Sequence, residues 1–177
     1  MRNLRFSVAL AGLVAVYGLI STPPAHAATM FTQAIATGSV CQLSIPTTNT
    51  GVRPKATGFR NESTKTSNFV ICPLPIPNYT GHGFTTVTVG LYSLDGAVRN
   101  VTCTAMTSWF GGGLIPVYSS KTVAVKTTTT NDIIVWNAPD FGAPEGYWFT
   151  VMSVTCNLPP QTAIAVIEGY YNYDIGT

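Results

Sequence analysis

Charged side chains are scarce in this 177-residue sequence. Nine residues are Lys or Arg and seven are Asp or Glu, together 9% of the chain, whereas an ordinary soluble domain has about 25%. The two signs nearly balance, which leaves no basic surplus to hold nucleic acid or an anionic membrane surface. We therefore expect no nucleic-acid partner, and a surface covered mainly by Thr, Ser, Asn, Gly and aromatic side chains.

Histidine is nearly absent as well. The chain has two, and one of them, His26, falls in the N-terminal segment that we expect to be removed. The other, His82, stands between two glycines in an expected turn, with no serine in a nucleophile motif beside it. A Ser-His-Asp or Cys-His apparatus needs an imidazole as its base. The sequence therefore predicts no catalytic residue and no enzyme activity.

The acidic residues give no clearer sign of chemistry. Most of them lie in expected turns, and Glu168, inside the last expected strand, is the exception. A glycosidase would need two carboxyl groups on facing strands. Asp140 and Glu145 flank a loop rich in Pro and Gly that could hold calcium through carboxylate and backbone oxygens, but the regular alternation of an EF-hand loop is missing. The cysteine spacings are too wide for zinc, so we predict no metal and no cofactor.

The sequence has no apolar run long enough to cross a bilayer. Its longest nearly unbroken run, residues 6–20, is shorter than the roughly 20 residues that a transmembrane helix needs. It follows two arginines and precedes a small-residue stretch that ends in Ala-His-Ala. That order of regions predicts a signal peptide over residues 1–27. We expect its removal to leave one domain, residues 28–177, that is secreted or periplasmic and has no stable membrane insertion.

Helical periodicity is absent from residues 28–177. No segment keeps apolar residues at helical spacing for three turns, whereas several alternate with a period of two, as half-buried strands do. We expect strands over residues 85–92, 98–105, 121–126, 133–136, 147–156 and 163–173, separated by turn-forming clusters. About eight or nine short strands in all predict an all-β fold, an antiparallel β-sandwich that is jelly-roll-like, with an up-and-down barrel as the alternative.

Four cysteines are present, namely Cys41, Cys72, Cys103 and Cys156. An even number in an exported chain predicts two disulfides, and the spacing alone leaves three pairings open. The last three cysteines each follow a valine by two positions. Residues two apart share one face of a strand, so we expect these three cysteines to be inward-facing strand residues.

Two short motifs carry a resemblance to known proteins. Residues 59–74, FRNESTKTSNFVICPL, contain a Val-x-Cys-Pro element, and residues 149–170, FTVMSVTCNLPPQTAIAVIEGY, contain a Cys-x-Leu-Pro element. Together they resemble a group of small exported bacterial proteins whose function is uncharacterised. The resemblance implies export, a sandwich fold and sequentially local disulfides, with Cys41 bonded to Cys72 and Cys103 to Cys156. It implies no activity.

Aromatic residues are concentrated in the second half of the chain. Trp109 and Phe110 directly precede three glycines, residues 111–113. We expect the chain to turn at these glycines and to pair the strand before them with residues 114–118. Neighbouring strand residues point to opposite faces, so one of the two rings should cover the end of the core and the other should be exposed.

These features predict a non-catalytic module of the bacterial envelope or extracellular space, with a binding or structural role and an unknown protein or glycan partner. Low charge, disulfides and missing catalytic groups favour this interpretation. The alternative is a carbohydrate-binding module that uses the exposed aromatics of residues 107–116, Trp109 and Phe110. It is favoured by the ability of such rings to stack on the apolar faces of sugars.

Overall fold

The computed structural model describes residues 29–45, 51–74, 84–109, 115–128, 132–145 and 152–174, and within them all side chains except those of residues 29–34, 109 and 172–174. The expected signal peptide, residues 1–27, lies outside these ranges. The strands are β1 (Thr29–Thr37), β2 (Gln42–Leu43), β3 (Val52–Lys55), β4 (Gly58–Asn61), β5 (Asn68–Pro73), β6 (Thr86–Ser93), β7 (Arg99–Trp109), β8 (Ile115–Val125), β9 (Asp132–Asn137), β10 (Met152–Leu158) and β11 (Thr162–Asp174). Two short 3-10 helices, η1 (Gly38–Val40) and η2 (Ala138–Phe141), complete the described part. Neither of these helices is long and apolar enough to cross a membrane.

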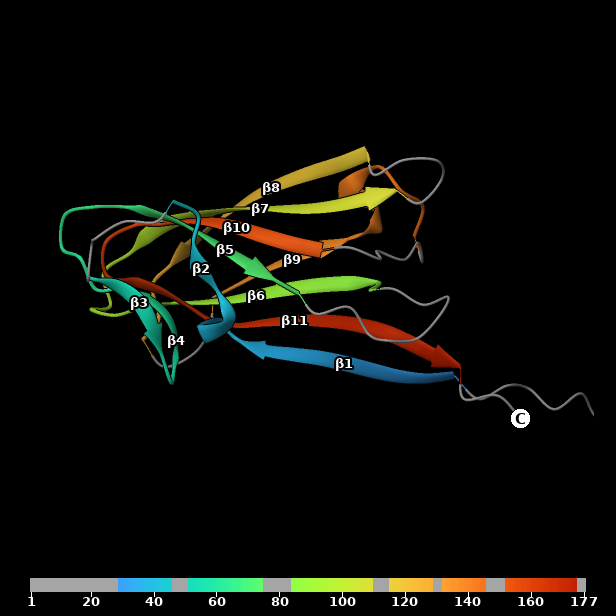
Figure 1. Cartoon of the computed structure of the whole chain (residues 1–177), viewed down its shortest axis with the longest axis horizontal. Coiled ribbons are helices and arrows are strands. Elements are labelled where there is room, and N and C mark those ends of the chain that lie inside the picture. The colour runs from blue at the N-terminus through green and yellow to red at the C-terminus, as the bar shows by residue number, and fades with distance from the viewer. Residues whose placement is uncertain are drawn as a thin grey trace, which may run out of the picture.

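The strands form two antiparallel sheets that pack face to face. Sheet A has six strands in the order β3-β4-β11-β6-β9, with β1 also paired to β11, and sheet B has five in the order β2-β5-β10-β7-β8. Figure 1 shows β8, β7, β10 and β5 in one layer and β6, β11 and β1 in the other. The predicted antiparallel β-sandwich with two disulfides is confirmed, and the barrel alternative is wrong.

The described ranges hold eleven strands, more than the eight or nine expected. The additional ones include β2, β3 and β4, which are two to four residues long. Strands this short contain too few residues to display a period of two. Strand β1 reads TMFTQAIAT, in which no regular alternation of large apolar residues marks a face. The expected strand over residues 121–126 is the second half of β8.

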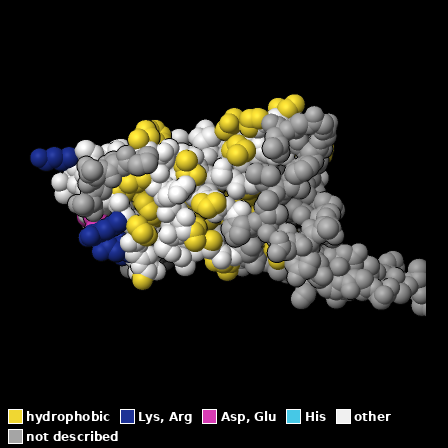
Figure 2. Space-filling view, in the orientation of Figure 1, with side chains coloured by type: hydrophobic (Ala, Val, Ile, Leu, Met, Phe, Trp, Pro, Cys, Tyr) yellow, Lys and Arg dark blue, Asp and Glu magenta, His cyan; other side chains and the backbone are white. Residues whose placement is uncertain are grey.

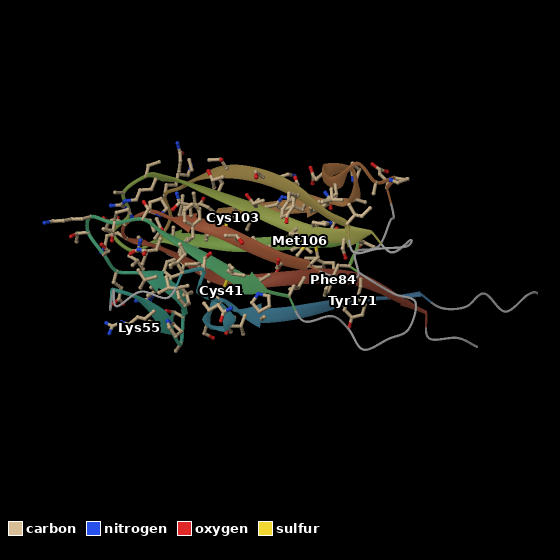
Figure 3. All side chains as sticks on the ribbon, turned by 45° about the horizontal axis from the view of Figure 1, so that its top comes forward. Cys41, Lys55, Phe84, Cys103, Met106 and Tyr171 are labelled. Atoms are coloured by element: carbon tan, nitrogen blue, oxygen red, sulfur yellow. A yellow bond between two sulfur atoms is a disulfide. The ribbon has the colours of Figure 1, made fainter. Side chains whose placement is uncertain are left out.

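The core lies between the sheets and comes from the inward positions of alternating strands. On β10, Met152, Val154, Cys156 and Leu158 are buried, and the residues between them are partly exposed. On the other layer, Phe84 packs edge-on against Tyr171 from β11, with ring centroids 6.0 Å apart (Figure 3). The alternation read from the sequence therefore sorts these side chains to the correct face.

Both disulfides lie in this core. Cys41, directly after η1, is bonded to Cys72 on β5, and Cys103 on β7 is bonded to Cys156 on β10. The latter two residues are directly opposite each other in the ladder between β7 and β10. The pairing that the resemblance implied is present. The expected inward orientation of Cys72, Cys103 and Cys156 is confirmed, because all three are fully buried.

One edge of β11 is shared by two other strands. Strand β1 pairs with it from Val166 onward, β4 pairs with it up to Ile164, and the ladder with β6 is irregular between these two residues. Gly38 and Gly58 both lie so close to the carbonyl oxygen of Ile164 that a Cβ at either position would overlap it. Gly58 also has a φ of +125°, which L side chains rarely adopt. These glycines allow β1 and β4 to meet at the same strand.

Strands β7 and β8 form a long antiparallel hairpin. Its register runs from Arg99 opposite Val125 to Trp109 opposite Ile115. The expected pairing across the glycine run is therefore confirmed. Residues 110–114, which connect the two strands, lie outside the described ranges.

Candidate functional site

The two aromatic residues predicted to bind a ligand fall at the limit of the described chain. Trp109 is the last residue of β7, where its backbone pairs with Ile115, but its side chain lies outside what the structure describes. Phe110 lies outside the described residues altogether, as does His82. The exposure of one of the two rings stays a prediction.

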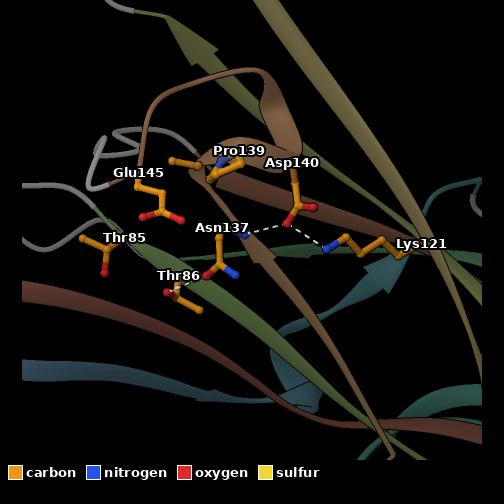
Figure 4. Close-up of a pocket in the computed structure, with 8 residues that line it drawn as sticks. Thr85, Thr86, Lys121, Asn137, Pro139, Asp140 and Glu145 are labelled. Carbon is orange, nitrogen blue, oxygen red and sulfur yellow. Dashed lines mark hydrogen bonds and ion pairs between the residues drawn. The ribbon is translucent and has the colours of Figure 1, made fainter.

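Asp140 and Glu145, the two residues considered for calcium, line the same pocket. This η2 pocket has a volume of about 360 Å³ and lies where η2 faces β8 and the start of β6 (Figure 4). Its lining consists of Thr85, Thr86, Lys121, Asn137, Ala138, Pro139, Asp140 and Glu145. Sequence reasoning therefore brought together two residues that do share a site.

Two charged residues of the η2 pocket, Asp140 and Lys121, make structural contacts. Oδ2 of Asp140 accepts a hydrogen bond from the backbone N–H of Asn137 at 2.8 Å and pairs with Nζ of Lys121 at 2.7 Å. The same Nζ donates to the carbonyl oxygen of Val135 at 2.7 Å. Burial by itself would raise the pKa of Asp140, but Lys121 and the Asn137 N–H outweigh it and lower that pKa. These contacts fasten η2 and β9 of one sheet to β8 of the other.

No metal site is evident at this pocket. Among the residues that the structure describes, no three His, Cys, Asp or Glu side chains come together. Asp140 already has one oxygen occupied by two donors, and its charge is balanced by Lys121. The geometry therefore gives no support to the calcium hypothesis.

Four other carboxylates also make local contacts. Glu62 pairs with Arg53, Asp95 pairs with Arg99, Asp132 accepts hydrogen bonds from the backbone N–H groups of Lys126 and Thr127, and Glu168 accepts one from the hydroxyl of Tyr170. The carboxylate of Glu168 raises the pKa of Tyr170, because the phenol that donates to it holds its proton more tightly. Because each of these four carboxylates has a local partner, we interpret them as structural groups.

The outer face of sheet B carries a larger hollow, with a volume of about 480 Å³. We name it the outer groove and define it by the eight residues that line it, which come from β5, β7, β8 and β10. They are Phe69, Thr102, Thr104, Met106, Tyr118, Ser153, Thr155 and Asn157. Neighbouring strand residues point to opposite faces, so the burial of Cys103 and Cys156 places the residues on either side of them in this groove.

The strand register gives the layout of the outer groove. Phe69 on β5 lies opposite Asn157 on β10, which lies opposite Thr102 on β7. Four residues further along β7, Met106 lies opposite Tyr118 on β8. Phe69 and Tyr118 are therefore three strand spacings apart across the sheet and four residues apart along it. At about 4.8 Å per spacing and about 3.3 Å per residue, their backbone positions are separated by roughly 20 Å.

Hydrogen-bonding groups form the floor between these two rings. The hydroxyls of Thr102 and Thr104 belong to this floor, and each also contacts a hydroxyl of β8 beside the groove, that of Thr122 at 2.8 Å and that of Ser120 at 2.7 Å. Oδ1 of Asn157 is buried, and no group in the described part of the chain donates a hydrogen bond to it. The floor can therefore offer both donors and acceptors to a ligand.

The outer groove is uncharged and has exposed aromatic rings at two corners. None of the eight side chains that line it is acidic or basic. In Figure 2, Lys and Arg gather at one end of the molecule, and the middle of the visible face shows hydrophobic and uncharged polar groups. Phe69 is 55% exposed and Tyr118 is 63% exposed. Such a surface suits a neutral ligand that has both apolar and hydroxyl groups.

Sequence reasoning missed the outer groove. The signal that could have found part of it was the set of Thr, Ser and Asn residues that alternate with the inward-facing cysteines. What could not be found was the strand order, because β10 lies between β5 and β7 in the sheet but comes after β5, β7 and β8 in the sequence. Phe69 and Tyr118 are brought to one surface only by that order.

Comparisons with known proteins do not identify a family. No protein-family model matches the sequence, and no curated protein matches it. Among solved structures, the chain is similar to a family 11 carbohydrate-binding module from Clostridium thermocellum, in complex with a β-1,3-1,4-mixed-linked tetrasaccharide. The identity is 8%, the TM-score is 0.34, and the match covers 80% of this chain and 86% of the other. A likeness at this level defines neither a family nor a ligand.

Proposed function

We propose that this protein is an exported, non-catalytic module that binds a neutral carbohydrate in the outer groove. The observation that carries the proposal is the composition of that groove. Two exposed aromatic rings and a methionine surround a floor of hydroxyl and amide groups, and no charged side chain is among the residues that line it.

A sugar has the chemistry that this surface complements. One face of a pyranose ring presents C–H groups, which pack against an aromatic ring, and its rim carries hydroxyls that both donate and accept hydrogen bonds. The Thr and Ser hydroxyls of the floor do the same. A charged ligand would find no counter-ion among the lining side chains.

The absence of reactive groups from the groove supports binding without catalysis. The eight lining residues include no carboxylate, imidazole or amine, and all four cysteines of the chain are held in disulfides. Disulfides are typical of proteins in oxidising compartments outside the cytoplasm. This agrees with the signal peptide expected over residues 1–27, and both support export.

Binding of the purified protein to an array of neutral and acidic polysaccharides tests the proposal. We expect at least one neutral glycan to bind and no acidic glycan to bind more tightly. Phe69→Ala should weaken that binding about 10-fold, which corresponds to about 1.4 kcal/mol, because it removes one stacking surface. Ile133→Ala is the matched control, since Ile133 is 56% exposed on β9 of sheet A, and it should leave the affinity unchanged.

Two outcomes would contradict this assignment. If no neutral glycan on the array binds, carbohydrate recognition is wrong, and the protein has a different partner. If Trp109→Ala or Phe110→Ala abolishes binding while Phe69→Ala has no effect, the site is the loop of residues 107–116 and the outer groove is not used.

A further inference from the structure

The outer groove runs diagonally across sheet B. Of the four strands that line it, β5 contributes only Phe69 and β8 contributes only Tyr118. The register puts these two residues at opposite corners, roughly 20 Å apart by strand spacing and rise. The outward residues at the other two corners, Pro73 on β5 and Thr122 on β8, are not part of its lining. The hollow therefore connects the two aromatic rings.

Hydrogen-bonding groups lie along the whole of this diagonal. From Phe69 it passes between Asn157 and Thr155 on β10, and then between Thr104 and Met106 on β7, before it reaches Tyr118. A single pyranose ring covers only one of the two aromatic rings. A short sugar can therefore use one end of the groove and part of its floor, but not both ends.

We propose that the ligand of the outer groove is an extended, β-linked neutral oligosaccharide chain that lies along this diagonal, with one sugar ring on Phe69 and another on Tyr118. The inference rests on the proposed carbohydrate-binding function. A β-1,4-linked chain advances by about 5 Å per unit, which is close to one strand spacing. A span of roughly 20 Å is therefore about four steps, so a chain of about five units places one sugar on each ring. An α-1,4-linked chain coils and does not follow a straight diagonal.

Calorimetric titration with oligosaccharides of increasing length tests this arrangement. The probes are β-1,4-linked gluco-, xylo- and manno-oligosaccharides of two to six units, with α-1,4-linked gluco-oligosaccharides of the same lengths as matched controls. In the β-linked series that binds, affinity should rise at least about 10-fold between two and five units, which corresponds to gaining the second ring. It should change less than about 2-fold between five and six units, and the α-linked series should bind at least about 10-fold more weakly.

Substitutions at the two ends provide a second readout. Phe69→Ala and Tyr118→Ala should each reduce the affinity for the five-unit chain to about that of the two-unit chain. Each should change the affinity for the two-unit chain by less than about 3-fold, because the other ring remains available. Tyr118→Phe keeps the ring and removes only the hydroxyl, so it should retain the length dependence. Thermal unfolding of each variant checks that the fold is kept.

The outcomes separate this inference from the function on which it rests. Equal affinity for two-unit and five-unit chains would overturn the spanning arrangement, as would equal affinity for α-linked and β-linked chains. It would also be overturned if the neutral glycans that bind on the array contain no extended β-linked chain. In each of these three cases the proposed carbohydrate binding would stand. Failure of every neutral glycan to bind would remove the function itself.

Discussion

Breaking each disulfide separately should show how much it stabilises the fold. The loop closed by Cys41 and Cys72 has a sequence separation of 31 residues, and the loop closed by Cys103 and Cys156 has one of 53. In the chain-entropy model, loops of these lengths restrict the unfolded chain by about 3.7 and about 4.2 kcal/mol. The two loops do not overlap in the sequence, so the contributions should add to about 8 kcal/mol. A whole domain is usually stable by about 5 to 15 kcal/mol.

Two double variants isolate the bonds. Cys41→Ala with Cys72→Ala keeps only the bond between β7 and β10, and Cys103→Ala with Cys156→Ala keeps only the bond to β5. Urea unfolding of each variant, with and without reductant, measures the free energy lost when the remaining bond opens and its sulfur atoms stay in the core. The cost of truncating the other two side chains cancels in this comparison. We expect a loss of about 4 kcal/mol in each variant.

The result could refute this reasoning in two ways. A loss below about 1 kcal/mol on reduction of either variant would show that restriction of the unfolded chain does not explain the stabilisation. A much larger loss for the bond between Cys103 and Cys156 would show that the bond acts through packing in the native state. The model allows the two losses to differ by only about 0.5 kcal/mol.

Substitution of one aspartate and of two glycines tests two further features, a hydrogen-bonded carboxylate and a close backbone approach. The backbone N–H of Lys126, together with the N–H and hydroxyl of Thr127, holds the pKa of Asp132 below its usual value. The stabilisation is therefore complete above about pH 4 and is lost as the pH falls through the folded-state value. Asp132→Asn should destabilise the protein by about 1 kcal/mol at neutral pH, and urea titrations at decreasing pH should show the difference from wild type shrinking; a constant difference would contradict this. Gly58→Ala should cost at least about 3 kcal/mol, because it combines an unfavourable φ with overlap on a backbone oxygen. Gly142→Ala, with a φ of +76° but nothing within 4 Å of an added Cβ, should cost only about 1 kcal/mol, and equal losses in thermal unfolding would disprove the role of the overlap.

Much of the fold follows from local alternation. Val87, Val89 and Leu91 on β6 alternate with Thr86, Thr88, Gly90 and Tyr92 and are fully buried, because a period of two matches the geometry of a strand. The same pattern identifies β7 and β10 through their inward cysteines. It fails for β2, β3 and β4, which are too short to show any period. β2 pairs with β5 and β4 pairs with β11, which are distant in the sequence, and β3 is held by its pairing with β4.

The candidate site was harder to predict for the same physical reason. A pair of aromatic residues before a glycine run is visible in the sequence, so Trp109 and Phe110 could be singled out. Phe69 and Tyr118 belong to different strands and give no common local signal. Only the order β5-β10-β7-β8 in sheet B places them over one floor. A surface site that depends on sheet topology is therefore invisible to reasoning from neighbouring residues.

The bond between Cys103 and Cys156 also has a consequence for the opposite side of the sheet. These residues face each other in the ladder, and their immediate neighbours, Thr102, Thr104, Thr155 and Asn157, all line the outer groove. A slip of one residue between two strands would turn every side chain of one of them to the wrong face, and a covalent link between opposed residues forbids that slip. The disulfide thus fixes the positions of the hydroxyl and amide groups of the floor in the unbound protein. A binding surface fixed in this way loses less conformational entropy on association.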